Sequence, residues 1–284
     1  MAEKAEWAEH HADRLRRTLI LEPRGHASMC GAVLTEPASP GAHAGVLFFH
    51  NSGFSALSGH GVLGVTRIAL DRGLVMPGGD GATIVFDTPA GTVRATAGAD
   101  RVSFLNVPSY VLHAGVPVDV GPRPLRADIA YGGAMYAIVD AEAAGLSIDA
   151  GHAPELSRAG VAIREAVKRV QPVDGTVFTG VPHEDGADLR NAVVFADGAV
   201  ERSPSGTATA AVMAVLDAMG LLGGDRPFVH EGILGTRFEG RLAGRTMAGD
   251  YPALTIEIAG EAWITGEHTF FVDERDPLKR GFRV

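Results

Sequence analysis

The sequence predicts a mixed α/β protein built from two similar halves, and three observations lead to this class. Sliding the 284-residue chain by 147 positions (205 − 58 = 147) places Ser58-Gly59 on Ser205-Gly206 without a gap. Each copy consists of an apolar strand, a polar turn, the Ser-Gly step and a helical run. Each helical run is followed by glycine, Gly73 or Gly220, which commonly ends helices. We therefore expect one strand-and-helix unit in two copies.

The same patterns predict the other elements of each half. The first half is expected to contain, in order, a helical segment at about 4–17, strands at 31–37 and 45–49, a helix at 58–72, and strand-rich stretches at 83–96 and 102–112. The second half is expected to contain a leading strand at 128–139, a helix at 154–169, strands at 175–182 and 191–195, a helix at 205–219, a strand-rich stretch at 229–243, and alternating runs at 253–260 and 262–272.

The leading strand of the second half has no counterpart in the first, because its equivalent falls before Met1. The repeat therefore predicts that the first half lacks its opening strand or takes it from elsewhere. We expect residues 1–124 together with 273–284 to form the first half-domain, and residues 125–272 to form the second.

Composition excludes several function classes. With 25 Lys and Arg against 34 Asp and Glu, the formal net charge is −9, which argues against nucleic-acid binding. No apolar run approaches the roughly 20 residues that span a membrane, and the charged N-terminal segment lacks a secretory apolar region, so we expect a cytoplasmic protein. The single cysteine, Cys30, lies in an apolar stretch and is expected to be a small buried thiol. No metal-ligand spacing or nucleotide-binding glycine motif is found in the sequence, so neither a metal site nor a nucleotide site is assigned.

The duplicated Ser-Gly step indicates an anion site. A helix N-terminus presents unpaired N–H groups and a partial positive charge, and glycine lets a carboxylate approach the backbone. One such step alone is most simply a helix cap, since serine is a preferred capping residue. Two steps that face each other across a cleft suit chemistry at an α-carbon, where one group removes a proton and its partner acts on the other face.

Several further motifs occur in one order along the chain: Glu22-Pro23-Arg24-Gly25-His26, the 47–61 segment, Asp87-Thr88-Pro89-Ala90-Gly91, Asp128–Val139, Arg202-Ser203-Pro204-Ser205-Gly206-Thr207 and Asp276–Phe282. On these residues the chain resembles the proline racemase family, which includes hydroxyproline 2-epimerases and trans-3-hydroxyproline dehydratases. The resemblance implies two pseudo-symmetric domains of α+β type, each a curved, mostly antiparallel sheet around a central helix, similar to diaminopimelate epimerase. It also implies an imino-acid substrate between the domains, no cofactor and a homodimer.

The resemblance assigns roles to seven residues. Ser58 and Ser205 occupy the two acid/base positions, and the residues that border the substrate carboxylate are Gly59, His60, Gly206 and Thr207. His60 and Glu201 would lie near the ring nitrogen, where the family usually has Asp at the position of Glu201.

The chain departs from the family pattern at three places. Racemases carry Cys at both acid/base positions, some epimerases carry Ser and Cys, and dehydratases pair Cys with Thr, whereas this chain has Ser at both. A hydroxyl is far more basic than a thiol and needs a neighbouring base, for which His60 and Glu201 are candidates; His60 is equally suited to orienting the ligand. The other departures are Ala134, where a larger residue is usual, and the absent His-Thr-Gly-Gly-Glu-like opening strand.

Three functions stay open on the sequence. The first is a cofactor-independent racemase or epimerase of proline or a hydroxyproline. The second is a trans-3-hydroxy-L-proline dehydratase, and the third is a homologue that binds an imino acid without turnover.

Overall fold

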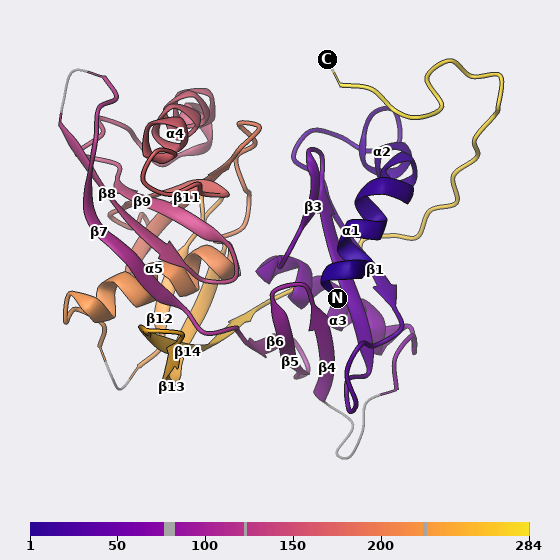
Figure 1. Ribbon diagram of the computed structural model, residues 1–284, viewed down its shortest axis with the longest axis horizontal. Coiled ribbons are helices and arrows are strands. Elements are labelled where there is room, and N and C mark those ends of the chain that lie inside the picture. The colour runs from indigo at the N-terminus through magenta and orange to yellow at the C-terminus, as the bar shows by residue number, and fades with distance from the viewer. Residues whose placement is uncertain (77–82, 122–123, 224–225, 284) are drawn as a thin grey trace. The chain divides into compact units, whose positions relative to one another are not determined.

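The computed structural model describes residues 1–76, 83–121, 124–223 and 226–283, which form two compact units (Figure 1). One unit comprises Met1–Val102 and Glu261–Val284, and the other comprises Ser103–Gly260. These bounds differ from the predicted half-domains. The predicted first half included residues 103–124, but the strand there pairs with β8 of the second unit. The predicted second half included residues 261–272, which the structure groups with the first unit.

The second unit is a large, mostly antiparallel sheet with two longer helices. Its elements are β6 (Val102–Leu105), β7 (Tyr110–Val118), β8 (Leu125–Tyr131), β9 (Met135–Asp140), the short helix η1 (Ala150–His152), α4 (Ala153–Val167), β10 (Gly175–Gly180), β11 (Leu189–Phe195), α5 (Gly206–Ala218), β12 (Phe228–Glu231), β13 (Arg237–Ala248) and β14 (Tyr251–Gly260). The strand order is β6-β14-β13-β12-β11-β10-β9-β8-β7. Ser109, just before β7, exchanges backbone hydrogen bonds of 2.9 and 2.8 Å with Leu254 of β14. The sheet therefore curves until its far strand meets its beginning.

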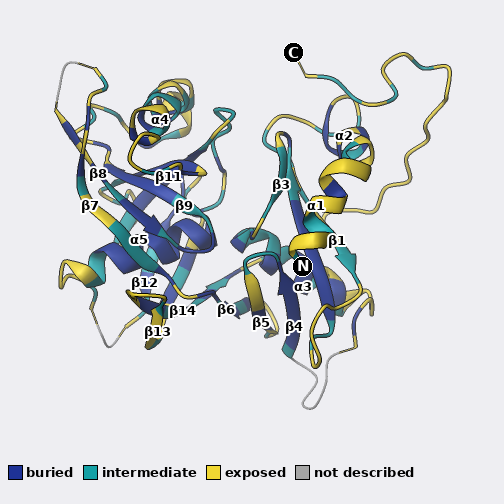
Figure 2. Cartoon of the chain, in the orientation of Figure 1, coloured by how far each residue is buried: buried dark blue, intermediate teal, exposed yellow. Residues whose placement is uncertain are grey.

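Helix α5 occupies the inside of this curved sheet (Figure 1). Every residue from Gly206 to Val215 is buried, and none of them carries a charge (Figure 2). A helix that is apolar on all sides is stable only when it is enclosed, so its composition explains its central position. The sequence resemblance predicted a curved, mostly antiparallel sheet around a central helix, and this part of the prediction is confirmed.

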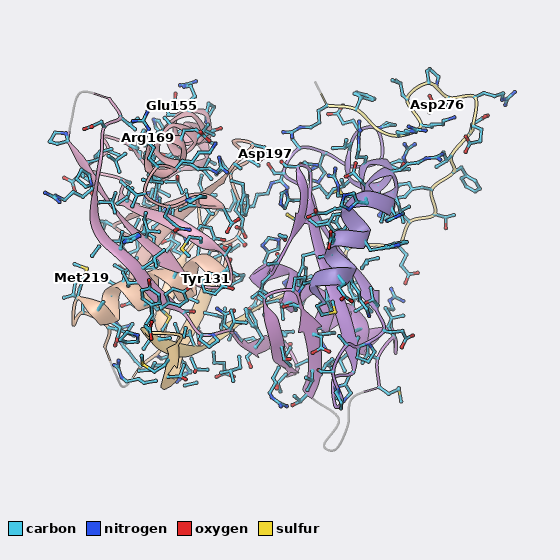
Figure 3. The ribbon with its side chains drawn as sticks, viewed as in Figure 1. Tyr131, Glu155, Arg169, Asp197, Met219 and Asp276 are labelled. Atoms are coloured by element: carbon cyan, nitrogen blue, oxygen red, sulfur yellow. The ribbon has the colours of Figure 1, made fainter. Side chains whose placement is uncertain are left out.

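Helix α4 packs against the sheet through one face only. Leu156, Ile163 and Val167 are buried in a cluster with strand residues such as Ala137 and Val139, while the opposite side of the helix is exposed. Figure 3 shows Glu155 and Arg169, near the two ends of this helical segment. Because side chains alternate along a strand, Tyr136 of β9 projects to the other face of the sheet, toward α5.

The first unit repeats part of this plan. Its elements are α1 (Ala2–His11), α2 (Asp13–Ile20), β1 (Cys30–Thr35), β2 (Ala44–His50), β3 (Gly53–Ser55), α3 (Gly59–Asp71), β4 (Thr83–Thr88) and β5 (Gly91–Ala97). The strand order is β1-β2-β4-β5, with β3 paired to β2. Helix α3 buries an apolar face that includes Val62, Leu63 and Ala69.

The two units share a topology as well as a sequence pattern. Helix α5 begins and ends 147 residues after α3, as the repeat predicted. Strands β2 and β11 each pair antiparallel with the strand that precedes them, β1 or β10, and parallel with the strand that follows the helix, β4 or β12. The units differ at one edge: β10 is flanked by β9, whereas β1 ends the strand order.

Both helices also end in the same way. After α5, Gly220 donates its N–H to the Asp217 carbonyl and Leu221 donates to the Leu216 carbonyl, at 2.9 and 2.8 Å. After α3, Gly73 and Leu74 make the equivalent pair of bonds at 3.1 and 2.8 Å. This pattern requires a left-handed residue after the helix, and Gly73 and Gly220 have φ of +61° and +70°.

Four local expectations were wrong. Residues 128–139 form the hairpin β8–β9 rather than one strand, because the chain turns at Gly132-Gly133. The helical segment at 4–17 is two helices that meet at Ala12. Cys30 is exposed, since it begins the edge strand β1. Residues 262–272 alternate like a strand but form none and stay accessible, with Phe271 87% exposed (Figure 2), because alternation makes a strand only where a neighbour pairs with it.

Among the described residues, no helix combines the length and the apolar character that a membrane crossing requires.

The two helix-ending glycines allow a matched stability test. A Cβ at Gly73 or Gly220 would meet no atom within 4 Å, so Gly73→Ala and Gly220→Ala introduce only backbone strain. We expect each to lower the free energy of unfolding by about 1 kcal/mol or more, because the left-handed conformation is costly for alanine.

Gly64→Ala is the control. Gly64 lies inside α3 with equally open space around it and no positive φ, so alanine there should raise the free energy of unfolding by roughly 0.5–1 kcal/mol. Urea denaturation of the three variants measures these changes. Stabilisation of all three would show that the glycines do not end the helices as described.

Candidate functional site

The first Ser-Gly step begins helix α3 in the first unit. Ser58 is the N-cap, with an extended backbone, and its Oγ accepts the Gly61 N–H at 3.3 Å. The Nε2 atom of His60 lies 3.5 Å from the same oxygen, at the limit of a hydrogen bond. A Cβ on Gly61 would lie 2.8 Å from the Phe48 ring and 2.9 Å from Ser58 Oγ. Glycine at this position therefore lets the first turn close onto the serine.

The segment before Ser58 is held by the β4–β5 turn. Ala90 of this turn donates its N–H to the Ala56 carbonyl at 3.3 Å. At the end of β4, Asp87 accepts hydrogen bonds from the backbone and side chain of Ser39 and from the Ala38 N–H, at 2.8 to 2.9 Å. Burial by itself would raise the pKa of Asp87, but these bonds together lower it, so the carboxylate stays charged and joins β4 to the loop at Ala38-Ser39.

The second Ser-Gly step begins helix α5 in the second unit. Ser205 is 2% exposed and caps the helix by accepting the Ala208 N–H at 3.4 Å. Its φ is +59°, whereas that of Ser58 is −133°. A positive φ is uncommon for a residue with a side chain and costs of order 1–3 kcal/mol, and such residues cluster at functional sites.

Glu201 is connected to Ser205 through Ser203. The Glu201 Oε1 atom accepts the Ser203 hydroxyl at 2.7 Å, and Ser203 Oγ accepts the Ser205 N–H at 3.1 Å. The contact that the structure describes therefore fixes the backbone of Ser205. The sequence had suggested Glu201 as a helper for the hydroxyl itself, and that role stays a prediction.

A polar cluster behind the second step fixes the residue before it. The Pro204 carbonyl accepts the Asn191 side-chain amide at 2.6 Å. Asn191 and Thr209 also contact Nδ1 of His230, at 3.2 and 3.0 Å. His230 is fully buried, and this burial lowers its pKa to about 3. The imidazole is therefore neutral at physiological pH, and its contacts with Asn191 and Thr209 are both made through Nδ1.

Two glycines allow the backbone to approach this end of α5 closely. A Cβ on Gly132, in the β8–β9 turn, would lie 2.1 Å from the Thr207 carbonyl oxygen. A Cβ on Gly232, after β12, would lie 2.9 Å from the Pro204 nitrogen. In Figure 3, Tyr131, next to Gly132, lies at the end of α5 opposite Met219. The turn and the β12 loop thus fix the helix start from two sides.

The predicted site residues are divided between the two units. The first unit brings together Ser58, Gly59 and His60, and the second brings together Glu201, Ser205, Gly206 and Thr207. Two features of this region were not predicted from the sequence: Tyr136, whose hydroxyl lies 2.8 Å from Thr207 Oγ1, and the cluster around His230. A signal for Tyr136 was available in the alternation of 135–139, which directs it to the face opposite Ala137 and Val139.

Each unit thus offers the start of a helix with a capping hydroxyl, a set of groups that suits a carboxylate and a proton transfer. The described residues include no cluster of three or more His, Cys, Asp or Glu side chains arranged to hold a metal ion.

Known proteins share this plan. The family profile described as proline racemase matches residues 1–283. The chain is 38% identical to a trans-3-hydroxy-L-proline dehydratase of Bacillus thuringiensis subsp. konkukian over 296 residues, which cover 99% of this chain and 89% of that protein. It is 37% identical to a proline racemase of Clostridioides difficile, with the same coverage. The crystal structure of a hydroxyproline epimerase from Agrobacterium vitis with bound trans-4-hydroxy-L-proline matches 100% of this chain and 86% of that one, with 28% identity and a TM-score of 0.91. The chain belongs to the proline racemase family.

Burial of His230 predicts a loss of stability in mild acid. The unfolded imidazole takes up a proton below about pH 6.5, whereas the folded one resists protonation down to about pH 3. Between these values the unfolded state binds more protons, so the free energy of unfolding should fall as the pH falls. His230 alone should remove about 2 kcal/mol between pH 6.5 and pH 5. Urea denaturation at several pH values measures this slope.

A His230→Gln variant should lose this part of the slope, even if it is less stable at neutral pH. His152 is the matched control, because its exposed ring bonds to Asp149 and this bond raises its pKa. A pKa that is raised in the folded state has the opposite effect on the free energy of unfolding: the stabilisation is present at low pH and is lost as the pH rises. An unchanged acid slope in the His230→Gln variant would contradict the described burial.

Proposed function

We propose that this protein is a cofactor-independent racemase or epimerase that acts at the α-carbon of proline or a hydroxyproline. One observation carries the proposal: in a member of the proline racemase family, two serines 147 residues apart cap two helices, and each accepts an N–H of its first turn. Ser58 and Ser205 would act as the opposed acid and base. Gly59, His60, Gly206 and Thr207 would border the carboxylate, with His60 and Glu201 also near the ring nitrogen.

The proposed reaction follows from the charge that develops. When a base removes the α-proton, negative charge spreads into the carboxylate, and N–H groups at a helix start stabilise such charge. A proton delivered to the opposite face of the carbon then inverts it. The step takes one proton and returns one, and it transfers no electrons, so its balance requires no cosubstrate.

Serine at both positions affects the rate more than the binding. A hydroxyl is far more basic than a thiol, so only a small fraction of either serine is ionised, and each depends on its neighbours for activation. Hydroxyl and thiol are close in size, so the ligand cradle is compatible with either. We therefore expect tight binding of a substrate-like ligand together with slow turnover.

A trans-3-hydroxy-L-proline dehydratase is the second candidate, and the identity of 38% to a protein of that activity favours it. In this reaction one serine would remove the α-proton and the other would protonate the departing 3-hydroxyl group. The product would be a ring imine in place of an inverted amino acid.

Solvent deuterium incorporation at Cα tests the proposal directly. Nuclear magnetic resonance in D2O should show exchange with at least one of L-proline, D-proline, trans-4-hydroxy-L-proline and trans-3-hydroxy-L-proline. Ser58→Ala and Ser205→Ala should each reduce the exchange rate by about 100-fold or more, because positioned proton transfer contributes typically 10²–10⁴-fold. Ser147→Ala, at an exposed serine of the second unit, is the control and should leave the rate unchanged.

The product separates the outcomes. Inverted amino acid supports the racemase or epimerase, whereas an imine that borohydride reduces to proline supports the dehydratase. Absence of exchange with all four compounds, together with measurable binding of pyrrole-2-carboxylate, would contradict both and leave the non-catalytic binding homologue.

Thiols at the two positions should accelerate exchange. In the Ser58→Cys, Ser205→Cys double variant a helix N-terminus lowers the pKa of each thiol toward neutrality, so more of the base is ionised. We expect at least a tenfold increase in the exchange rate, within the range of general acid–base effects. The exposed native thiol is removed in a matched Cys30→Ser background. A decrease would show that the hydroxyls have a role that thiols cannot replace.

We also propose, from the family resemblance, that the protein is a cytoplasmic homodimer. Light scattering coupled to size-exclusion chromatography measures its mass against the 29.6 kDa chain.

A further inference from the structure

A buried chain of hydroxyl groups begins at Ser205. Ser205 Oγ lies 3.3 Å from Thr207 Oγ1, and Thr207 Oγ1 lies 2.8 Å from the hydroxyl of Tyr136. All three side chains are at most 2% exposed. The contact with Tyr136 is the shorter of the two and joins strand β9 to the first turn of α5.

Each hydroxyl of this chain can donate or accept a hydrogen bond. Burial raises the pKa of Tyr136 well above its ordinary value, the negative charges of Glu201 and Asp174 add to the increase, and hydrogen bonding with Thr207 and Ser205 opposes it. The phenol therefore keeps its proton at neutral pH and can donate it to Thr207 Oγ1. When the phenol is the donor, the single proton of the threonine hydroxyl is directed to Ser205 Oγ.

This direction leaves the Ser205 oxygen with two donors, the Thr207 hydroxyl and the Ala208 N–H. Hydrogen bonds donated to an oxygen favour its ionised form, so both make Ser205 a better acid. Its own proton is then available for the ligand. The equivalent neighbour in the first unit is His60, which stands at the position of Thr207 in the repeat and offers an imidazole instead.

We propose that Tyr136 is a positioning residue that orients the hydroxyl of Thr207 toward Ser205 and so makes Ser205 the stronger proton donor of the two serines. The inference rests on the proposed acid/base role of Ser205. It adds a residue outside the predicted site and gives the two serines unequal roles: Ser58, beside an imidazole, as the group that more readily takes a proton, and Ser205 as the group that gives one.

The test titrates a thiol in place of the hydroxyl, so it requires no turnover. In a Cys30→Ser, Ser205→Cys background, the ultraviolet absorbance of the thiolate reports the only thiol in the chain as the pH is raised. Adding Tyr136→Phe, which keeps the ring and removes the hydroxyl, should raise the apparent pKa of this thiol by about half a unit, which is about threefold less thiolate below the pKa.

Three further variants separate positioning from packing. Thr207→Val interrupts the chain and should reproduce the shift, while Thr207→Ser keeps the hydroxyl and should not. Tyr131→Phe removes a phenol from the same hairpin and is the matched control, with no shift expected. Circular dichroism of each variant verifies that it is folded.

Turnover provides a second readout in the protein with serine at position 205. Tyr136→Phe should lower kcat for exchange about tenfold and leave KM unchanged, because Tyr136 acts through Thr207 and not on the ligand. If the unmodified protein shows no exchange, the proposed function fails while the titration still decides on Tyr136. If Tyr136→Phe shifts the thiol pKa no more than Tyr131→Phe does, the inference is overturned.

Discussion

The N-terminal end of helix α5 is the feature on which most of the second unit depends. The helix is enclosed by the curved sheet, so the amide groups of its first turn are removed from bulk water and need partners from the protein or from a ligand. Ser205 supplies one partner at 3.4 Å, and the close approach of Gly132 and Gly232 fixes the backbone around it. A buried and positioned helix start of this kind is suited to a carboxylate, which its backbone amides can bind without a cationic side chain.

The duplication places a serine-capped helix start in both units, but the surroundings of the two serines differ. Ser58 has an extended backbone and the imidazole of His60 nearby, whereas Ser205 has a positive φ and a chain of hydroxyls behind it. Reaction at one carbon from two faces needs one group that accepts a proton and one that donates it. Under the proposed function, the different surroundings of the two serines would supply this asymmetry even though the residue type is the same.

The repeat predicted the central helix of each unit, because a helix that recurs with its cap and its final glycine has the same boundaries in both copies. Elements whose form depends on distant pairing were less predictable. Residues 262–272 alternate as a strand does, yet nothing in that pattern shows whether another strand lies beside them. The hairpin at Gly132 was missed for a related reason. Glycine is needed there because the backbone lies close to Thr207, and Thr207 is far away in the sequence. Tyr136 and His230 act through contacts of the same long-range kind, so their neighbours could not be seen from the sequence.

Under the proposed function, both Ser-Gly steps would bind one substrate, with its carboxylate on the helix amides and its α-carbon between Ser58 and Ser205. A crystal structure with pyrrole-2-carboxylate, a planar mimic of the deprotonated α-carbon, tests it most directly. We expect the carboxylate to accept hydrogen bonds from first-turn amides of α3 and α5, with Ser58 Oγ and Ser205 Oγ on opposite faces of the ring. A ligand bound elsewhere, or one that contacts only one of the two serines, would contradict it.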